Sequence, residues 1–406
     1  MASWKQDLEQ AVDRHFDHMV EIRRHLHCNP EVSGHERQTS LYLYQLLGDR
    51  RFEVRMGPEG RGVIADARFG GRDCPQGLLA LRADIDALRI HDEKDVPYRS
   101  GHDGMMHACG HDAHTAILAG TLSVLNELQR AGSLPWPMRV RGIFQPAEET
   151  ARGAREMISV GAMDHVDAIL ALHVDPTRRL GVIGLRTGVF TANCDEIEFR
   201  IVGRGGHAAR PHEAHDPIAA AAQLLNGLYL FVPRATDSRD AVVVTIGQVE
   251  AGHTPNVIPE EVLLRGTMRT LERDVRTSTI QHIQRLAEGI GKTTDTQIRV
   301  NSHASTPSVV NDTRMADLIR RVVGELDGEL RIDEIARPSM GSEDFAFYLD
   351  CAPGAMFRLG CTTDRAGGMP LHNPDLDIDE EALRVGARVM ARAAIRWAEP
   401  GQTSRS

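Results

Sequence analysis

The sequence predicts an α/β protein in which a larger domain with a mostly parallel sheet is interrupted by a smaller inserted α+β domain of the ferredoxin-like type. Two observations lead to this prediction. Strand-like and helix-like segments alternate through the first half of the chain, which is typical of a parallel sheet with helices on both faces. From about Gly188 the pattern becomes strand–helix–strand–strand–helix–strand, which is typical of a split βαβ unit.

In the first domain, charges at helical spacing predict a helix over residues 4–27, and Pro30 with Ser33 and Gly34 ends it. Short apolar runs bounded by turn residues predict the strands that follow, and longer periodic segments predict the helices between them. The expected order is helix 35–47, strands 62–69 and 78–84, helix 112–128, strand 139–144, helix 151–160 and strand 167–174.

In the second domain, apolar and polar residues alternate over 194–202, which predicts a half-buried strand. The order that follows is helix 216–230, strands 241–249 and 261–270, helix 273–289 and strand 297–302. Helix–strand alternation returns after Thr306, so the second domain is an insertion. We assign residues 1–187 and 305–406 to the first domain and residues 188–304 to the inserted domain.

The composition restricts the classes of function. A length of 406 residues favours two domains, and a formal net charge of −10 disfavours nucleic acid or an anionic membrane as the main partner. The sequence has no run of about twenty apolar residues that would span a bilayer, and its N-terminus lacks the features of a signal peptide. The six cysteines are dispersed without paired spacing, which predicts reduced thiols and a cytoplasmic location.

The segment Met106–Thr115 concentrates chemically active side chains, with one thiol, three imidazoles and one carboxylate. Gly110 allows a tight turn between Cys109 and His111, so a thiolate and an imidazole can point at one position. Further ligand-type residues lie at or just beyond the carboxyl ends of successive predicted strands, where open α/β sheets place their sites, or far downstream: Asp84, Asp86, Glu148, Glu149, His173 and His372. A single histidine is most often a surface or core residue, but this constellation predicts metal chemistry.

Two assignments stay open on the residues alone. Glu148 and Glu149 are adjacent in an extended loop and point in opposite directions, so they need two different roles, but the sequence does not say which residue has which. Asp84 and Asp86 are candidates for orienting a metal-bound imidazole through its second N–H group. For Asp86, a simple role in a turn at the end of a strand is as well supported.

Five motifs of the sequence resemble those of the two-metal amidohydrolases: Leu81–Leu88, Met106–His114, Gln145–Glu149, Gly205–His212 and Met340–Phe345. This family includes hippurate hydrolases, N-acyl-L-amino acid amidohydrolases and hydrolases of indole-acetyl amino acids, and it is related to the glutamate carboxypeptidases. The resemblance covers almost the whole chain in order. It implies a zinc-peptidase-like fold for residues 1–187 and 305–406, which we expect to form the catalytic metal-binding domain. We expect residues 188–304 to form a lid and dimerisation domain.

The resemblance also implies roles for individual residues. Two divalent ions, of Zn, Mn, Co or Ni, would be held by five side chains, with the Cys109 thiolate shared: Cys109, His111, Glu149, His173 and His372. Glu148 would be the general base. His207 would donate a hydrogen bond to the oxyanion, from the same chain or from a partner subunit. The residues implied in substrate binding are Asn256, Arg269, Gly341 and Ser342.

The implied reaction is the hydrolysis of the amide bond of N-acyl-L-amino acids by metal-activated water, in a homodimer or a higher homo-oligomer. A guanidinium such as that of Arg269 suits a free carboxylate, because it binds it with two hydrogen bonds. One alternative is a dipeptidase or carboxypeptidase on the same scaffold. Another is a non-catalytic metal-binding dimer, which predicts an incomplete ligand set, whereas here all five ligands and the base are present.

Overall fold

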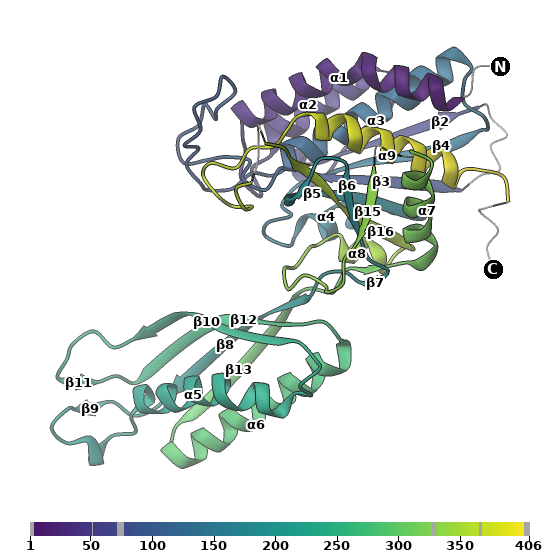
Figure 1. The fold of residues 1–406 in the computed structure, drawn as a ribbon. Helices are drawn as coiled ribbons and strands as arrows, with labels where there is room; N and C mark the ends of the chain where they lie inside the picture. The colour runs from purple at the N-terminus through teal and green to yellow at the C-terminus, as the bar shows by residue number, and fades with distance from the viewer. Residues whose placement is uncertain are drawn as a thin grey trace. The chain divides into compact units, whose positions relative to one another are not determined.

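The computed structural model describes residues 4–50, 52–70, 77–326, 328, 330–364 and 368–401. The chain forms two compact units (Figure 1). Unit 1 consists of Met1–Gly188, Val310–Arg337 and Asp344–Ser406, and unit 2 consists of Val189–Val309 and Pro338–Glu343.

Unit 1 is built on an eight-stranded sheet whose four neighbouring strands β4, β3, β5 and β16 run parallel to one another. Antiparallel pairs join β1 to β2, β2 to β4 and β16 to β6. In spatial order the strands are β1 (Glu53–Met56), β2 (Val63–Phe69), β4 (Met138–Gln145), β3 (Leu78–Asp84), β5 (Val166–Arg179), β16 (Gly354–Thr362), β6 (Val182–Leu185) and β15 (Arg331–Glu334). Every residue of β3 is buried, as expected for a strand with helices on both faces.

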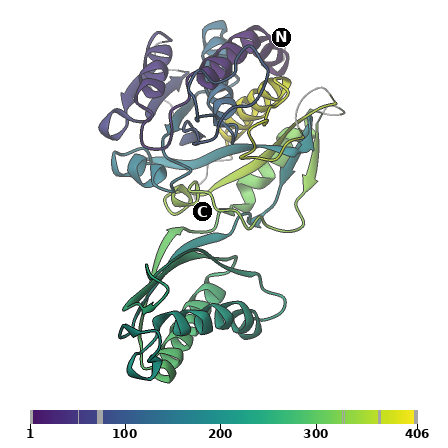
Figure 2. The same ribbon diagram turned by 90° about the vertical axis from the view of Figure 1, so that its left-hand side faces the viewer.

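Helices cover this sheet within unit 1, and Figure 2 shows them from a second direction. They are α1 (Trp4–Cys28), α2 (Arg37–Gly48), α3 (His111–Ala131), α4 (Gly153–Ser159), α7 (Thr313–Gly324), α8 (Ala346–Leu349) and α9 (Glu381–Trp397). The long helices α1, α3 and α9 pack against one another, and their apolar residues, such as Leu122 and Val389, join the sheet in one core. The mixed α/β architecture with a large, mostly parallel sheet confirms the predicted fold class.

One detail of the sheet differs from the prediction. The sequence places His173 at the end of a strand, but β5 continues to Arg179, because its pairing with β16 extends through Val174 and Asp175. His173 therefore lies within a strand, and the residues before and after it are paired with β16.

Unit 2 contains a four-stranded antiparallel sheet with its own apolar core. In spatial order the strands are β10 (Val242–Ala251), β12 (Glu261–Thr270), β8 (Asn193–Val202) and β13 (Gln297–Thr306). The helices α5 (Pro217–Ala235) and α6 (Arg273–Thr294) pack on this sheet. The alternating strand β8 turns Ile197, Phe199 and Ile201 into the core.

Short elements complete the described residues: η1 (Pro58–Gly60), β7 (Gly188–Val189), β9 (Gly206–His207), η2 (Pro211–Glu213), β11 (Val257–Ile258) and β14 (Val310–Asn311). Among the described residues, no helix combines the length and the apolar character needed to cross a membrane.

Candidate metal centre

The turn before α3 brings a thiol and an imidazole together. Gly110 has a φ of +84°, and a Cβ atom at this position would lie 2.4 Å from Cγ2 of Val174, so only glycine fits here. The helix α3 begins at the next residue, His111. Both Cys109 and His111 are buried. The local sequence thus fixes two potential ligands at the start of a helix packed in the core.

The five predicted ligands all lie in unit 1, and they form two groups of three. In each group the potential ligand atoms lie within 4.8 Å of one another. One group is Cys109, His111 and His173, and the other is Cys109, Glu149 and His372. Cys109 belongs to both groups. This arrangement suits two neighbouring cations that share a thiolate.

Hydrogen bonds fix the tautomers of two histidines. Nδ1 of His111 lies 3.0 Å from the carbonyl oxygen and 3.1 Å from Oδ1 of Asp86, and Nδ1 of His173 lies 2.7 Å from the carbonyl oxygen of Val174. Oxygen atoms of these groups only accept, so each Nδ1 carries a proton and each Nε2 is the ring atom left to contact a cation. Nε2 of His173 lies 3.5 Å from the thiol sulfur of Cys109.

The donor set fits a cation. Nε2 of His111 and Oε1 of Glu149 are buried and have no hydrogen-bond partner of acceptable geometry among the described residues. Nε2 of His372 lies 3.3 Å from this oxygen of Glu149, and Nε2 of His111 lies 4.0 Å from it. A buried polar atom without a partner is unfavourable, and a divalent ion would satisfy these atoms.

The pKa values of Cys109 and His173 favour a metal site over a reactive thiol. Burial raises the pKa of the Cys109 thiol to about 12, which is the opposite of an activated nucleophile. Burial lowers the pKa of His173 well below its usual value, so its imidazole is neutral. A thiol of this kind becomes a thiolate when a cation binds to it.

Asp84 is near the ligands but contacts a different histidine. Its Oδ1 lies 2.6 Å from Nδ1 of His114, and its Oδ2 accepts a hydrogen bond of 2.7 Å from Arg82. Nε2 of His114 accepts a hydrogen bond of 2.9 Å from the backbone N–H of Val174. Both nitrogens of His114 are therefore used, although this residue lies within ligand distance of Asp84 and His111.

His114 was not singled out by the sequence reasoning. Its signals were its place at the end of the motif Met106–His114 and its position three residues after His111, which puts both histidines on one face of α3. Through Val174, the pair of Asp84 and His114 fixes the backbone beside His173. Asp86 has the more direct position, because it contacts both His111 and the N–H of Glu149.

The loop after β4 carries the two glutamates with an unusual backbone. Ala147 and Ala151 have φ values of +52° and +55°, so the chain turns sharply on both sides of the pair. The carboxylate of Glu148 comes within 4.8 Å of ligand atoms of His111 and Glu149, but only Glu149 joins a group with Cys109.

The predicted substrate-binding residues and His207 lie in unit 2, where they form two sets. His207 pairs with Val257 in the ladder between β9 and β11, and the N–H of Ala208 donates to the carbonyl oxygen of Asn256 over 3.1 Å. The side chains of His207 and Asn256 are exposed. In the second set, Nη1 of Arg269 donates to the carbonyl oxygen of Met340 over 2.9 Å.

That bond places Arg269 beside the segment that contains Gly341 and Ser342, both of which are exposed. The N–H of Ala192, next to β8, donates to the carbonyl oxygen of Gly341 over 3.1 Å, so the segment is fixed within unit 2.

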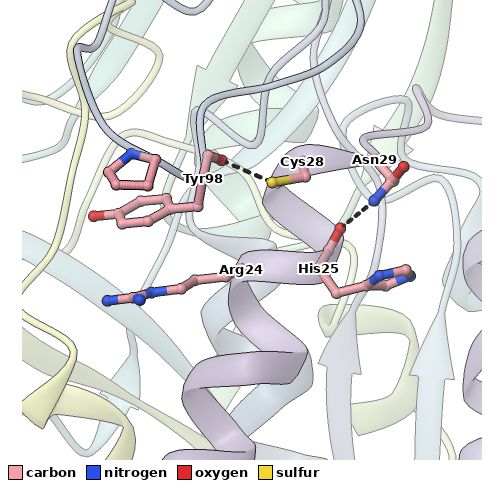
Figure 3. A pocket seen from close by; sticks show the side chains of 6 residues that line it. Arg24, His25, Cys28, Asn29 and Tyr98 are labelled. Atoms are coloured by element: carbon pink, nitrogen blue, oxygen red, sulfur yellow. Dashed lines mark hydrogen bonds between the residues drawn. The ribbon is translucent and has the colours of Figure 1, made fainter.

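A separate depression of about 470 Å³ lies at the end of α1 (Figure 3). The thiol of Cys28 points across it and donates to the carbonyl oxygen of Tyr98 over 3.3 Å. The residues that line it are Arg24, His25, Cys28, Asn29, Pro97 and Tyr98. None of them is a predicted site residue, so this depression is not the candidate site.

Comparison with known proteins shows the family to which this fold belongs. The model of peptidase family M20/M25/M40 matches residues 80–396, and the chain belongs to this family. Among curated relatives, a probable hydrolase of Synechocystis is 40% identical over 392 residues, which cover 96% of this chain and 98% of the relative. An N-acetyl-L-cysteine deacetylase of Bacillus subtilis is 37% identical over 387 residues, which cover 95% of this chain and 90% of the relative.

Solved structures give the same result. A putative aminohydrolase from methicillin-resistant Staphylococcus aureus has a TM-score of 0.90 at 30% identity, covering 97% of this chain and 100% of that chain. A dinuclear metal-binding peptidase of Bacillus subtilis has a TM-score of 0.82 at 34% identity, and the match covers 95% of this chain and 99% of that chain. The chain is therefore a metal-dependent amidohydrolase or peptidase with a dinuclear metal site, and it hydrolyses amide bonds.

Proposed function

We propose that this enzyme hydrolyses the amide bond of N-acyl-L-amino acids to a carboxylic acid and a free amino acid. The observation that carries the proposal is the pair of ligand groups that share Cys109, beside a second glutamate that belongs to neither. A relative of known name, the N-acetyl-L-cysteine deacetylase, supports the N-acyl amino acid as the class of substrate.

In the proposal, Cys109, His111, Glu149, His173 and His372 hold two divalent ions of Zn, Mn, Co or Ni. Thiolate and imidazole ligands favour Zn, Co or Ni, and the carboxylate is compatible with Mn. Bound ions supply Lewis acid chemistry, which polarises the amide carbonyl and acidifies water. Asp86 orients His111, and the pair of Asp84 and His114 holds the strand that carries His173.

Glu148 moves the proton. It takes a proton from the attacking water as the new C–O bond forms, and it gives this proton to the amine nitrogen as the C–N bond breaks. Water is the nucleophile, so no covalent bond to the enzyme forms. His207 donates a hydrogen bond to the oxygen of the carbonyl as negative charge develops on it.

Arg269, Asn256, Gly341 and Ser342 bind the amino acid part of the substrate. Arg269 binds its carboxylate, for which a guanidinium offers two parallel hydrogen bonds. In the structure Arg269 is half-buried and has a backbone carbonyl as a partner, so its side chain already lies in a fixed direction.

We also propose that unit 2 acts as a lid and as the contact in a homodimer. The strand β10 is at the edge of its sheet, and such an edge is protected when it pairs with the same strand of a second copy. Leu230 and Phe231 on α5, which packs beside β10, are exposed at 63% and 56%. Apolar side chains of this size beside an open edge favour a protein contact.

A cytoplasmic location is proposed on the state of the cysteines. Cys28, Cys109, Cys351 and Cys361 are present as thiols. Reduced thiols are the usual state in the cytoplasm.

The test is a substrate panel with the metal-free protein reloaded with each of the four ions. N-acetyl, N-benzoyl and indole-acetyl amino acids are compared with free-amine dipeptides. Turnover of the acyl amino acids in the reloaded enzyme, and not in the metal-free protein, is the expected result. Turnover of the dipeptides alone would show a dipeptidase instead, and no turnover of any amide with any ion would refute the proposal.

A further inference from the structure

The carboxylate of Glu36 has an unusual position for a residue at the start of a helix. Glu36 precedes α2 as its N-cap, where an acidic side chain normally accepts from the first N–H groups of its own helix. Here it makes no such hydrogen bond. The residue is fully buried instead, at 0% exposure, so its carboxylate must find hydrogen-bond donors outside α2.

What it contacts is the loop that carries the two glutamates of the candidate site. Oε1 of Glu36 accepts hydrogen bonds of 2.8 Å from the N–H of Ala147 and 2.8 Å from the N–H of Gly34. Ala147 is the residue before Glu148, and it has the left-handed φ of +52°. Non-glycine residues rarely adopt this conformation unless their surroundings hold them in it.

A second buried carboxylate acts on the other side of Glu148. Oδ2 of Asp86 accepts a hydrogen bond of 3.1 Å from the N–H of Glu149, and it also accepts one of 2.6 Å from the hydroxyl of Ser33. The backbone on both sides of Glu148 is thus held by acceptors. One of them, Glu36, and the donor to the other, Ser33, come from the same short segment between α1 and α2.

We propose that Glu36 is a positioning residue for the general base: by accepting the N–H of Ala147, it holds the turn that aims Glu148 at the reacting atoms. This inference rests on the proposed role of Glu148. Glu36 itself touches neither substrate nor metal. Its other oxygen, Oε2, lies 3.9 Å from Nη1 of Arg61, which is too long for a hydrogen bond. Because the task of Glu36 is to accept hydrogen bonds through Oε1, a neutral acceptor of the same shape can replace it.

The first test compares three substitutions of Glu36. Glu36→Gln keeps an oxygen that can accept both N–H groups, and its kcat should stay within about 3-fold of the parent. Glu36→Leu has a similar volume and no acceptor, and its kcat should fall on the order of 10-fold to 10²-fold, since a small misplacement of a reacting group has effects of this size. KM and metal content should not change.

Glu31→Leu is the matched control. Glu31 lies in the same segment, and its carboxylate accepts the backbone N–H of Thr39 over 2.7 Å. Among the described residues, no hydrogen bond joins this carboxylate to the glutamate loop. This variant should keep the parental kcat per folded molecule. If Glu36→Leu does not fold, Glu36→Asp replaces it, because a carboxylate that is one methylene shorter does not reach Ala147 in the same way. Parental kcat in Glu36→Leu or in Glu36→Asp would overturn the inference.

The second test separates an effect through Glu148 from a general loss of structure. In the background of Glu148→Gln, which lacks the base, Glu36→Leu should lower kcat no further, because residues that act as one unit are not additive. If the two losses multiply, Glu36 does not act through Glu148, and the inference fails while the proposed function stands. If Glu148→Gln alone keeps full activity, the assignment of the base fails first, and the positioning role fails with it.

Discussion

Glu148 and Glu149 are adjacent residues with identical side chains, but the two carboxylates have different neighbours. The prediction that they point in opposite directions is wrong, because the turn at Ala147 and the bond from Glu149 N–H to Asp86 leave both carboxylates within 4.8 Å of each other and of His111. What distinguishes them is that only Glu149 also forms a group with Cys109 and His372. Glu148→Gln should therefore keep its metal ions and lose on the order of 10²–10⁴ in kcat, the usual effect of removing an acid or base. Metal analysis and steady-state kinetics on the same sample test this. Loss of metal in this variant would mean that the two glutamates have the opposite roles.

Cys109 is the ligand on which both groups depend. Its removal should affect both ions, so Cys109→Ala is expected to lose bound metal and activity together. Cys361 provides the control, because it is also a buried thiol whose pKa burial raises to about 12, and it is in neither ligand group. Elemental analysis should find full metal content in Cys361→Ala. Full metal content and activity in Cys109→Ala would refute the shared-ligand site.

The burial of Glu36 also has a consequence for stability. Burial raises the pKa of this carboxyl to about 7, from a value of 4.5 in an open environment. Between these values the folded state holds the proton more tightly than the unfolded state, so the contribution of Glu36 to stability is complete below 4.5 and is lost as the pH rises through 7. Glu36→Gln has no proton to lose. Its melting temperature minus that of the parent should therefore increase from pH 5 to pH 8, whereas a constant difference would contradict the assigned pKa.

At the scale of elements, the start of α3 is fixed by α1. Nδ1 of His27 lies 2.7 Å from Oδ2 of Asp112, and Nε of Arg23 donates to the same oxygen over 3.3 Å. Burial opposes the ionisation of Asp112, but His27 and Arg23 outweigh it and hold the pKa of this carboxyl below its usual range. The residue after His111 is therefore anchored by charge, in addition to the apolar packing of the two helices.

The strand β12 carries the proposed carboxylate-binding residue. Arg269→Ala should lower kcat/KM for N-acyl amino acids by about 10-fold or more, because their carboxylate is the charged partner of the guanidinium. The kcat/KM for the corresponding C-terminal amides, which lack this charge, should hardly change. Arg265→Ala is the control on the same strand, since Arg265 is exposed and pairs with Glu198 and Glu250. Equal losses on acids and amides would instead assign Arg269 to holding Met340.

The order of elements was predictable from the sequence because it depends on local periodicity. The position of Glu149 just beyond the end of β4 was predictable for the same reason, whereas His173, expected at a strand end, lies within β5. The structure brings Cys109 and His372 together from distant segments, as the motifs implied. Contacts that depend on the direction of a side chain were not predictable from the sequence. Glu36 and Ala147 are 111 residues apart, and nothing in the local pattern links them. Likewise, the bond from His114 to Asp84 requires the helix and the strand to be placed first.

At the scale of the whole molecule, unit 1 holds the proposed ligands and the base, whereas unit 2 holds His207. Each unit has a separate core, so the role of a lid that we propose for unit 2 requires no change in the packing inside either unit. Closure of a lid excludes water and completes a site only when substrate is bound. His207→Ala should therefore lower kcat while metal content and fold stay intact.

A mixture of two variants tests whether His207 acts in its own chain or across the proposed dimer. His207→Ala keeps the base, and Glu148→Gln keeps the histidine. If His207 acts on the partner's site, a mixed dimer contains one site with both residues intact, and activity should rise above the sum of the two parents once subunits exchange. Exchange is followed independently with two fluorescent labels, one on each variant. Proven exchange without any gain would eliminate the cross-subunit arrangement, because every site in such a mixture would then lack either its histidine or its base.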